Sequence, residues 1–251
     1  MKFISLFAGI GGLDLGLERA GMECVAQVEI EEFCQKVLTK HWPNVPKFKD
    51  VRDVGKHNLP KADVICGGFP CQPHSQAGKR QGSLDDRDLW PEFSRIIGEC
   101  KPRWVISENV SGLLSSENGR FFGRVLRDLS ASGYDVEWQS VPLAAFGAPH
   151  IRERILMVAY PKHSGLSEQG SPNWKGASEH ITSLSWSWPT RPVSISDIPR
   201  RVDGISDRVD RLRSIGNAVS PAMGEFIGHV IMKSKTCLTP RVLDGATVAE
   251  N

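Results

Sequence analysis

The sequence predicts an α/β fold whose sheet is mostly parallel and is covered by helices on both faces. Strand-like and helix-like segments alternate over the first 160 residues, which is typical of parallel strands joined by crossover helices. The chain has 251 residues, of which 40% are hydrophobic and 24% are charged, so it can form a full core. These figures exclude a disordered, collagen-like or disulfide-dense protein.

The first strand is expected over residues 2–7, because an apolar run ends there at a glycine cluster. A helix follows, since Leu13, Leu17 and Ala20 recur at helical spacing and Gly21 supplies a stop. The same reasoning gives further strands over 24–28, 61–66, 103–107, 134–141 and 154–160, and further helices over 31–41, 89–100, 120–130 and 221–232.

The net charge and the cysteine spacing exclude few classes of function. The 31 Lys and Arg residues against 29 Asp and Glu residues give a net charge of +2, which neither proves nor excludes a nucleic-acid partner. The six cysteines form no CxxC pair and no zinc-type spacing with histidine, so we expect reduced thiols and no metal site. No run approaches the roughly 20 apolar residues that span a bilayer. We therefore expect a cytoplasmic protein with no membrane contact.

A glycine-rich turn at residues 7–12 joins the first strand to the first helix. Its sequence is Phe-Ala-Gly-Ile-Gly-Gly, and such a turn lets backbone N–H groups approach a ligand closely. Glu29 ends the next strand, where a carboxylate accepts hydrogen bonds from ribose hydroxyls in nucleotide-binding α/β folds. The turn and the carboxylate together predict a nucleotide cofactor without saying which one.

A second loop, at residues 67–75, carries a candidate nucleophile. Prolines at positions 70 and 73 stiffen this loop, and Cys71 should face the same crevice as the glycine turn, because the loop directly follows a strand. A thiol in that position suits covalent catalysis. Cys66 lies within the strand itself and fits a buried structural thiol instead.

Charged residues at the ends of two later strands complete the candidate site. Glu108 follows an apolar strand and should meet Cys71 across the crevice, where partial burial would raise its pKa and let it donate a proton at neutral pH. Arg152 and Arg154 open the strand at 154–160; taken alone they fit ordinary surface charges better than a site.

These motifs, in this order, resemble those of the DNA cytosine-5 methyltransferases. The likeness rests on the glycine turn, Glu29, Pro-Cys-Gln at 70–72, Glu-Asn-Val at 108–110, Arg-Glu-Arg at 152–154 and Gly-Asn-Ala-Val at 216–219. It covers residues 2–160 and about 208–232. It implies a Rossmann-like S-adenosylmethionine-dependent methyltransferase fold with a small irregular DNA-recognition region. One departure is Ser5, which stands where many relatives carry aspartate.

The resemblance also implies a reaction. The thiolate of Cys71 would add to C6 of a cytosine flipped out of the duplex, and Glu108 would supply a proton at N3. C5 would then take the methyl group of S-adenosylmethionine, and loss of the C5 proton with expulsion of the thiol would give 5-methylcytosine. Arg154 would bind the pyrimidine O2, and Arg152 would order the pocket beside it.

Cofactor and DNA contacts follow residue by residue from the same resemblance. The residues expected around S-adenosyl-L-methionine are Phe7, Gly9, Ile10, Gly11, Glu29, Ile30, Asp50, Val51, Pro70, Leu89, Asn217 and Ala218. Those expected to contact double-stranded DNA are Gln72, Ser75, Lys79, Arg80, Arg191, Arg200 and Arg201. The resemblance implies a monomer, and a restriction endonuclease as a functional partner rather than a bound subunit.

The chain should divide into a catalytic and cofactor-binding domain at 1–160, a short target-recognition region at 161–203, a segment at 204–235 that returns to the catalytic domain, and a disordered tail at 236–251. The recognition region is rich in Ser, Gly, Pro and Trp and is shorter than is usual in the family. Three alternatives are an RNA (tRNA) cytosine-5 methyltransferase, a catalytically silent DNA-binding relative and a nicotinamide-dependent oxidoreductase. The last leaves Pro-Cys-Gln without a role.

Overall fold

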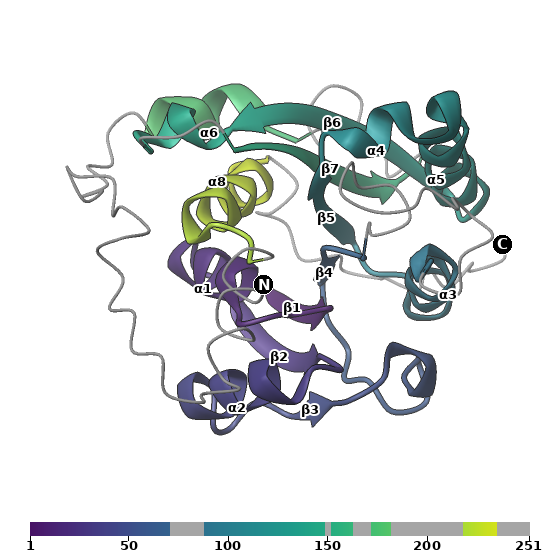
Figure 1. Cartoon of the computed structure of the whole chain (residues 1–251), viewed down its shortest axis with the longest axis vertical. Coiled ribbons are helices and arrows are strands. Elements are labelled where there is room, and N and C mark those ends of the chain that lie inside the picture. Colours follow the sequence, from purple (N-terminus) through teal and green to yellow (C-terminus); the bar gives the residue numbers. More distant parts are fainter. Residues whose placement is uncertain (71–87, 149–151, 163–171, 182–217, 235–251) are drawn as a thin grey trace, which may run out of the picture.

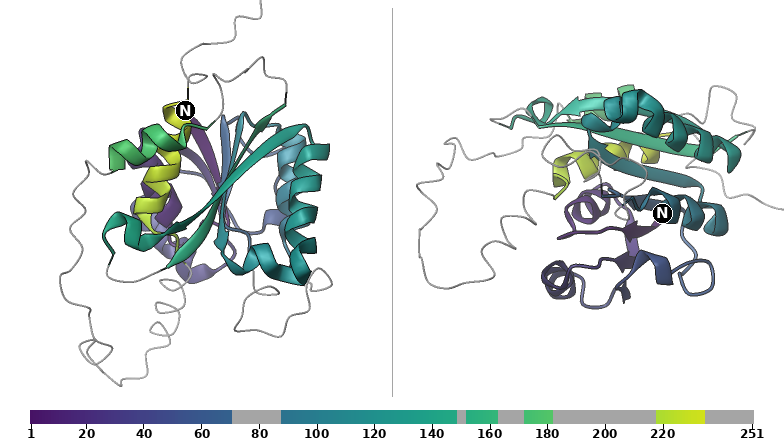
Figure 2. Two further views of the ribbon diagram at one scale, coloured as in Figure 1. Left: turned by 90° about the horizontal axis from the view of Figure 1, so that it is seen from above. Right: turned by 45° about the vertical axis from the view of Figure 1, so that its right-hand side comes forward.

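The structure is a computed structural model, and it describes residues 1–70, 88–148, 152–162, 172–181 and 218–234 of the chain, without the side chains of 179–181. These residues form one seven-stranded sheet with helices on both faces (Figures 1 and 2). The predicted α/β fold class is confirmed.

The sheet has the strand order β3-β2-β1-β4-β5-β7-β6. Strands β1 to β5 pair in parallel, whereas β7 runs antiparallel to both β5 and β6. The order reverses between β1 and β4, which is the position where ligands bind in open α/β sheets. The strands are β1 Lys2–Leu6, β2 Glu23–Val28, β3 Lys47–Phe48, β4 Val64–Gly67, β5 Trp104–Val110, β6 Tyr134–Pro142 and β7 Glu153–Pro161.

Two hydrophobic cores fill the spaces between the sheet and its helices. One lies between the sheet and α1, α6 and α8, and the other between the sheet and α3 and α5 (Figure 2). The α-helices are α1 Gly12–Arg19, α2 Glu32–His41, α3 Trp90–Cys100, α4 Gly112–Ser115, α5 Arg120–Ala131, α6 Trp174–Ile181 and α8 Pro221–Met232. Short 3₁₀ turns are η1 Val51–Asp53, η3 Ser116–Gly119 and η4 Leu143–Phe146.

Most elements lie where the sequence predicts them, within one to three residues at each end. Three of the strands and α-helices were not predicted, and one of them is the four-residue helix α4, which is too short to show a periodic pattern. Strand β3 is only two residues long and carries no periodic signal. Helix α6 lies in the predicted recognition region at 161–203, where the sequence shows little periodicity. Its Trp174 packs against Phe226 of α8, with the two ring centroids 6.0 Å apart. The side chain of Trp174 also donates a hydrogen bond to Glu137 of β6, so this tryptophan is used in packing.

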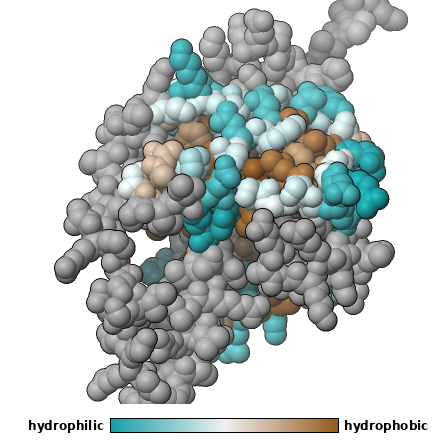
Figure 3. Space-filling model, turned by 45° about the horizontal axis from the view of Figure 1, so that its top comes forward, coloured by the Kyte–Doolittle hydropathy of each residue, from teal (hydrophilic) through white to brown (hydrophobic). Residues whose placement is uncertain are grey.

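Strand β6 forms one edge of the sheet, and its outer face is partly apolar. The face of the molecule seen in Figure 3 has hydrophobic residues exposed between hydrophilic ones. Trp138 of β6 is 42% exposed and lies edge-on against Phe122 of α5.

Over the described part of the chain, none of the helices has both the length and the apolar character that crossing a membrane requires.

Glycines let α8 lie directly against α1. A Cβ added at Gly16 would lie 2.4 Å from the Pro221 carbonyl oxygen, and one added at Gly224 would lie 2.8 Å from the Leu13 carbonyl oxygen. Both obstacles are backbone atoms, so a side-chain rotation cannot relieve the contact. The predicted segment 204–235 therefore includes a helix that packs on the first helix of the chain.

We expect Gly16→Ala to lower the free energy of unfolding by about 2–3 kcal/mol, because the added methyl group forces the two helices apart. Gly123→Ala in α5 is the matched control, since a Cβ there meets nothing within 4 Å. It should raise stability by roughly 0.5–1 kcal/mol through helix propensity alone. Urea denaturation measures both changes; equal effects of the two substitutions would contradict this account of the α1–α8 contact.

Candidate active site

A cavity of about 430 Å³ opens at the carboxyl ends of the five parallel strands. Its lining comes from the residues that follow or end each strand in turn, which are Phe7 after β1, Glu29 after β2, Asp50 after β3, Pro70 after β4 and Glu108 in β5. The volume lies in the range of small-molecule sites. The cavity lies beside the β1–β4 reversal, where the sequence analysis expects the cofactor crevice.

The glycine turn and Glu29 form the first wall. The N–H of Gly9 donates to Glu29 Oε2 at 2.7 Å, and the N–H of Glu31 donates to Oε1 at 2.8 Å. Burial raises the pKa of the Glu29 carboxyl, and these two bonds oppose that rise. The two oxygens of a carboxylate have about four acceptor positions, and the main-chain N–H groups of Gly9, Ile30 and Glu31 bond to this one, so room for a further donor remains. A ribose hydroxyl is such a donor.

Two residues predicted to contact the cofactor, Ile10 and Gly11, do not line the cavity. Gly11 has a φ of 83°, and a Cβ there would lie 2.5 Å from the ring of Trp42. Glycine is therefore needed at this position for the turn and for packing against the end of α2. The sequence motif correctly marks the turn but does not reveal which side of it faces the cavity.

A buried polar cluster supports the glycine turn from below. The carboxylate of Asp14 in α1 accepts hydrogen bonds from Ser5 Oγ of β1 at 2.9 Å and from Gln27 Nε2 of β2 at 2.7 Å. Burial raises the pKa of Asp14 to about 6. Ser5 stands out in the sequence as a departure from the family, but its bond to Asp14 could not be predicted, because nine residues and a turn separate the two.

The second wall is the loop after β3. Asp50 accepts hydrogen bonds from the main-chain N–H of Arg52 at 3.0 Å and from its guanidinium at 2.9 and 2.6 Å. These bonds and the positive charge of Arg52 hold the pKa of the Asp50 carboxyl below its usual value. Asp50 and Val51 both line the cavity, and Asp50 presents an ionised acceptor there.

The third wall carries the predicted proton donor. Glu108 in β5 is buried, and its Oε1 lies 2.9 Å from Nε of Arg154 in β7. Burial raises the pKa of the Glu108 carboxyl, while the charges of Arg154 and Arg152 oppose that rise. Arg152 donates to the carbonyl oxygen of Ala218 at 2.8 Å. The surface-charge alternative for the two arginines is therefore wrong.

Cys71 itself lies outside the described residues, but contacts with β5 hold residues 68 and 69, which precede it. Pro70 lines the cavity, and Asn109 Nδ2 of β5 donates to the carbonyl oxygen of Phe69 at 3.2 Å. Gly68 lies close to Glu108, since an added Cβ would be 3.2 Å from a Glu108 carboxylate oxygen. The sequence analysis included Asn109 in a motif without giving it this role.

Of the predicted cofactor residues, those that line the cavity are Phe7, Gly9, Glu29, Ile30, Asp50, Val51, Pro70, Leu89 and Ala218. The predicted residues that lie outside the described part of the chain are Cys71, Asn217 and the DNA contacts Gln72, Ser75, Lys79, Arg80, Arg191, Arg200 and Arg201. Within the described residues, no three His, Cys, Asp or Glu side chains gather as a metal site requires.

Comparison with known proteins gives a consistent result. Residues 1–198 match the model of the C-5 cytosine-specific DNA methylases. The chain is 34% identical to the type II methyltransferase M.BsuFI of Bacillus subtilis, over 68% of this chain and 42% of that protein. It is 29% identical to M.NgoMIV of Neisseria gonorrhoeae, over 93% of this chain and 98% of that protein.

Among solved structures, the fold is similar to that of the Entamoeba histolytica methyltransferase EhMeth, with a TM-score of 0.64 at 16% identity, over 92% of this chain and 98% of that one. Several of the known relatives are longer than this chain, which spans about half their length.

The Asp14 cluster predicts a pH-dependent stability. The folded-state pKa of Asp14, about 6, lies above the ordinary 3.8, so folding favours the protonated form. Stability from this group is full below pH 4 and is lost as the pH rises through 6. We expect the free-energy difference between wild type and Asp14→Asn to shift by roughly 2–2.5 kcal/mol in favour of the variant from pH 4 to pH 7. Urea denaturation across this range measures it; a constant difference would contradict the assignment.

Proposed function

Because the chain belongs to the C-5 cytosine-specific DNA methylase family, we propose that it transfers a methyl group from S-adenosyl-L-methionine to C5 of a flipped-out cytosine in double-stranded DNA. One observation carries this proposal. The Glu108 carboxyl and the Arg154 guanidinium, 2.9 Å apart, open into the same cavity as the carboxylates of Glu29 and Asp50. Groups suited to a pyrimidine and acceptors suited to a nucleoside therefore line one cavity.

The cofactor fits the acceptors of the cavity. Glu29, which lines the cavity, would accept from the ribose hydroxyls, and ionised Asp50 would accept from the adenine amino group. Phe7, which follows β1, would pack on the adenine ring. When bound, S-adenosylmethionine supplies an electrophilic methyl group on a positively charged sulfur. At the cofactor end of the cavity, the residues of the chain would orient that methyl group toward the base.

The base would be held and activated from the other side of the cavity. Arg154 donates toward the pyrimidine O2 while its Nε keeps the Glu108 carboxyl in place. Glu108 gives its proton to N3 as the Cys71 thiolate forms a bond to C6, which moves electron density to C5. The raised pKa of Glu108 supports this role, because burial makes the protonated form of this carboxyl easier to reach.

C5 then takes the methyl group. The carbon–sulfur bond of the donor breaks and S-adenosylhomocysteine is left. Removal of the C5 proton by a base then expels the Cys71 thiolate from C6, and N3 returns its proton to Glu108, so the aromatic ring and the starting state of the enzyme are restored. Arg152, which donates to the Ala218 carbonyl, would hold the later part of the chain against the pocket. This is covalent catalysis with electrostatic stabilisation of the ring as its charge develops.

DNA would reach the cavity by base flipping, since C5 of a stacked cytosine is inaccessible to residues at a sheet edge. The predicted DNA contacts at Gln72, Ser75, Lys79 and Arg80 follow Cys71 directly in the chain, and Arg191, Arg200 and Arg201 belong to the proposed recognition region at 161–203. We further propose that the chain divides at 1–160, 161–203, 204–235 and 236–251, that it acts as a monomer, and that a separate restriction endonuclease is its functional partner.

We expect a covalent complex between this protein and DNA in which 5-fluorocytosine replaces cytosine throughout, formed in the presence of S-adenosylmethionine and seen on a denaturing gel. Fluorine at C5 leaves no proton to remove, so the bond from the Cys71 sulfur to C6 persists. Cys71→Ala should abolish the complex. Cys100→Ala, which removes a partly buried thiol of α3 that does not line the cavity, should leave it intact.

The same gel distinguishes the alternatives. A complex with 5-fluorocytosine tRNA but none with DNA would overturn the DNA assignment in favour of an RNA methyltransferase. The absence of a complex with either nucleic acid would indicate a DNA-binding relative without this chemistry. A complex that survives Cys71→Ala would contradict the assigned nucleophile.

A further inference from the structure

We infer that Arg95 is a positioning residue for the adenine end of the cavity, acting through the loop 50–58 that carries Asp50 and Val51. The inference rests on the proposed function, since it takes this cavity as the cofactor site. Arg95 does not line the cavity itself. Any effect on a bound nucleoside must therefore pass through the loop.

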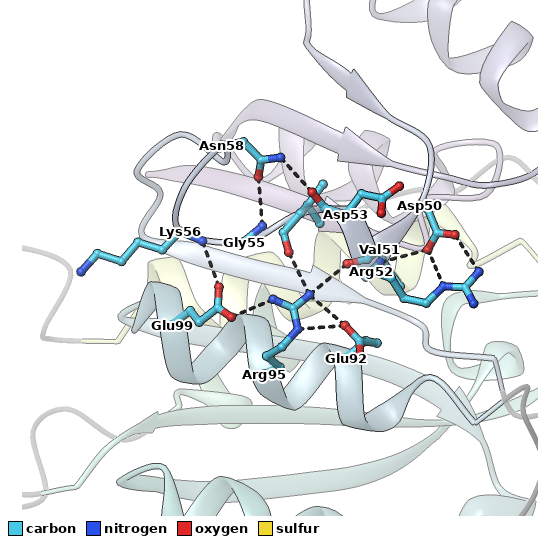
Figure 4. A network of polar contacts seen from close by, with 11 residues as sticks. Asp50, Val51, Arg52, Asp53, Gly55, Lys56, Asn58, Glu92, Arg95 and Glu99 are labelled. Atoms are coloured by element: carbon cyan, nitrogen blue, oxygen red, sulfur yellow. Dashed lines mark hydrogen bonds and ion pairs between the residues drawn. The ribbon is translucent and has the colours of Figure 1, made fainter.

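Arg95 holds this loop by its backbone. From α3 its Nη2 donates to the carbonyl oxygen of Val51 at 3.2 Å and to that of Val54 at 2.9 Å (Figure 4). Val51 is therefore held in two ways: its carbonyl oxygen accepts from Arg95, and its side chain is buried in the core. One guanidinium joins α3 to both ends of the 3₁₀ turn η1.

The guanidinium is in turn held by two carboxylates of its own helix. Its Nε donates to Glu92 at 2.8 Å, and its Nη1 donates to Glu99 at 2.7 Å, so the arginine is fixed one turn in each direction along α3. Glu99 also accepts the N–H of Lys56 at 3.1 Å. A planar guanidinium with fixed donors transmits position better than a flexible ammonium group.

The loop is shaped to receive these groups. A Cβ added at Gly55 would lie 2.3 Å from a Glu99 carboxylate oxygen, so the close approach of Glu99 needs glycine there. Asn58 accepts from the Gly55 N–H at 3.0 Å and donates to the Asp53 carbonyl at 2.9 Å (Figure 4). The loop is therefore closed on itself by Asn58 and is attached to α3 through Arg95 and Glu99.

The position of the Asp50 carboxylate decides whether it meets an amino group. A shift of about 1 Å lengthens a hydrogen bond beyond its useful range. Removing the guanidinium would release the Val51 and Val54 carbonyls and let the loop shift relative to β1 and Glu29. We therefore expect loss of Arg95 to weaken recognition of the adenine amino group and to leave the ribose and methionine contacts intact.

The test compares two ligands by isothermal titration calorimetry on the full chain. S-adenosylhomocysteine has the amino group, and S-inosylhomocysteine has a carbonyl oxygen in its place. We expect Arg95→Met to raise the Kd for S-adenosylhomocysteine by about tenfold and the Kd for the inosine analogue by less than about twofold. Arg127→Met, which removes an exposed arginine of α5, is the matched control and should change neither.

Each other outcome has a definite meaning. If the wild type binds no S-adenosylhomocysteine, the proposed function fails. If the wild type binds but Arg95→Met leaves both Kd values unchanged, or raises both equally, the positioning role is overturned and the cofactor site stands. Should Arg95→Met fail to fold, Glu99→Gln replaces it, with an expected rise of about threefold for S-adenosylhomocysteine alone. An unchanged Kd in that variant would also overturn the role.

Discussion

The ion pair between Glu108 and Arg154 depends on the direction of a single strand. Strand β5 ends at Val110, and β7 begins at Glu153 and runs antiparallel to it, with Arg154 in register opposite Val110. Because β7 starts where β5 ends, an arginine at its beginning reaches a carboxylate at the other strand's end. A parallel β7 would carry Arg154 to the far edge of the sheet. Burying such a pair adds little stability on balance, which points to a role in the site.

The carboxyl groups around the cavity differ in pKa because their surroundings differ. Asp50 is kept ionised by the adjacent Arg52, whereas burial raises the pKa of Glu108 and of Glu29. Asp14 lies deepest, beneath the glycine turn, and its bonds join β1, β2 and α1. The site thus has a charged acceptor at one wall and a carboxyl that retains its proton more readily at another. In the proposed reaction these are the cofactor end and the base end.

Much of the fold and part of the site could be predicted from the sequence. Apolar periodicity located most strands and helices, because each element has one buried face. Glu29 and Glu108 were found because they lie at strand ends, whereas Arg154 was assigned to the site only through the resemblance of the ordered motifs to a family. Partners distant in sequence could not be predicted. The Asn109–Phe69 bond and the contact of Gly11 with Trp42 join segments whose approach depends on the assembled sheet. Helix α6 was missed because its packing on α8, rather than a periodic pattern, stabilises it.

The central claim is that one cavity unites a nucleoside site with the pyrimidine chemistry of Cys71. The most direct measurement is a crystal structure of the chain with S-adenosylhomocysteine. We expect the ribose hydroxyls on the Glu29 carboxylate and the Cys71 sulfur facing the same cavity, since reacting atoms must approach to roughly 3–3.5 Å. A ligand bound elsewhere, or a Cys71 sulfur more than about 10 Å from both the Glu108 carboxyl and the glycine turn, would contradict it.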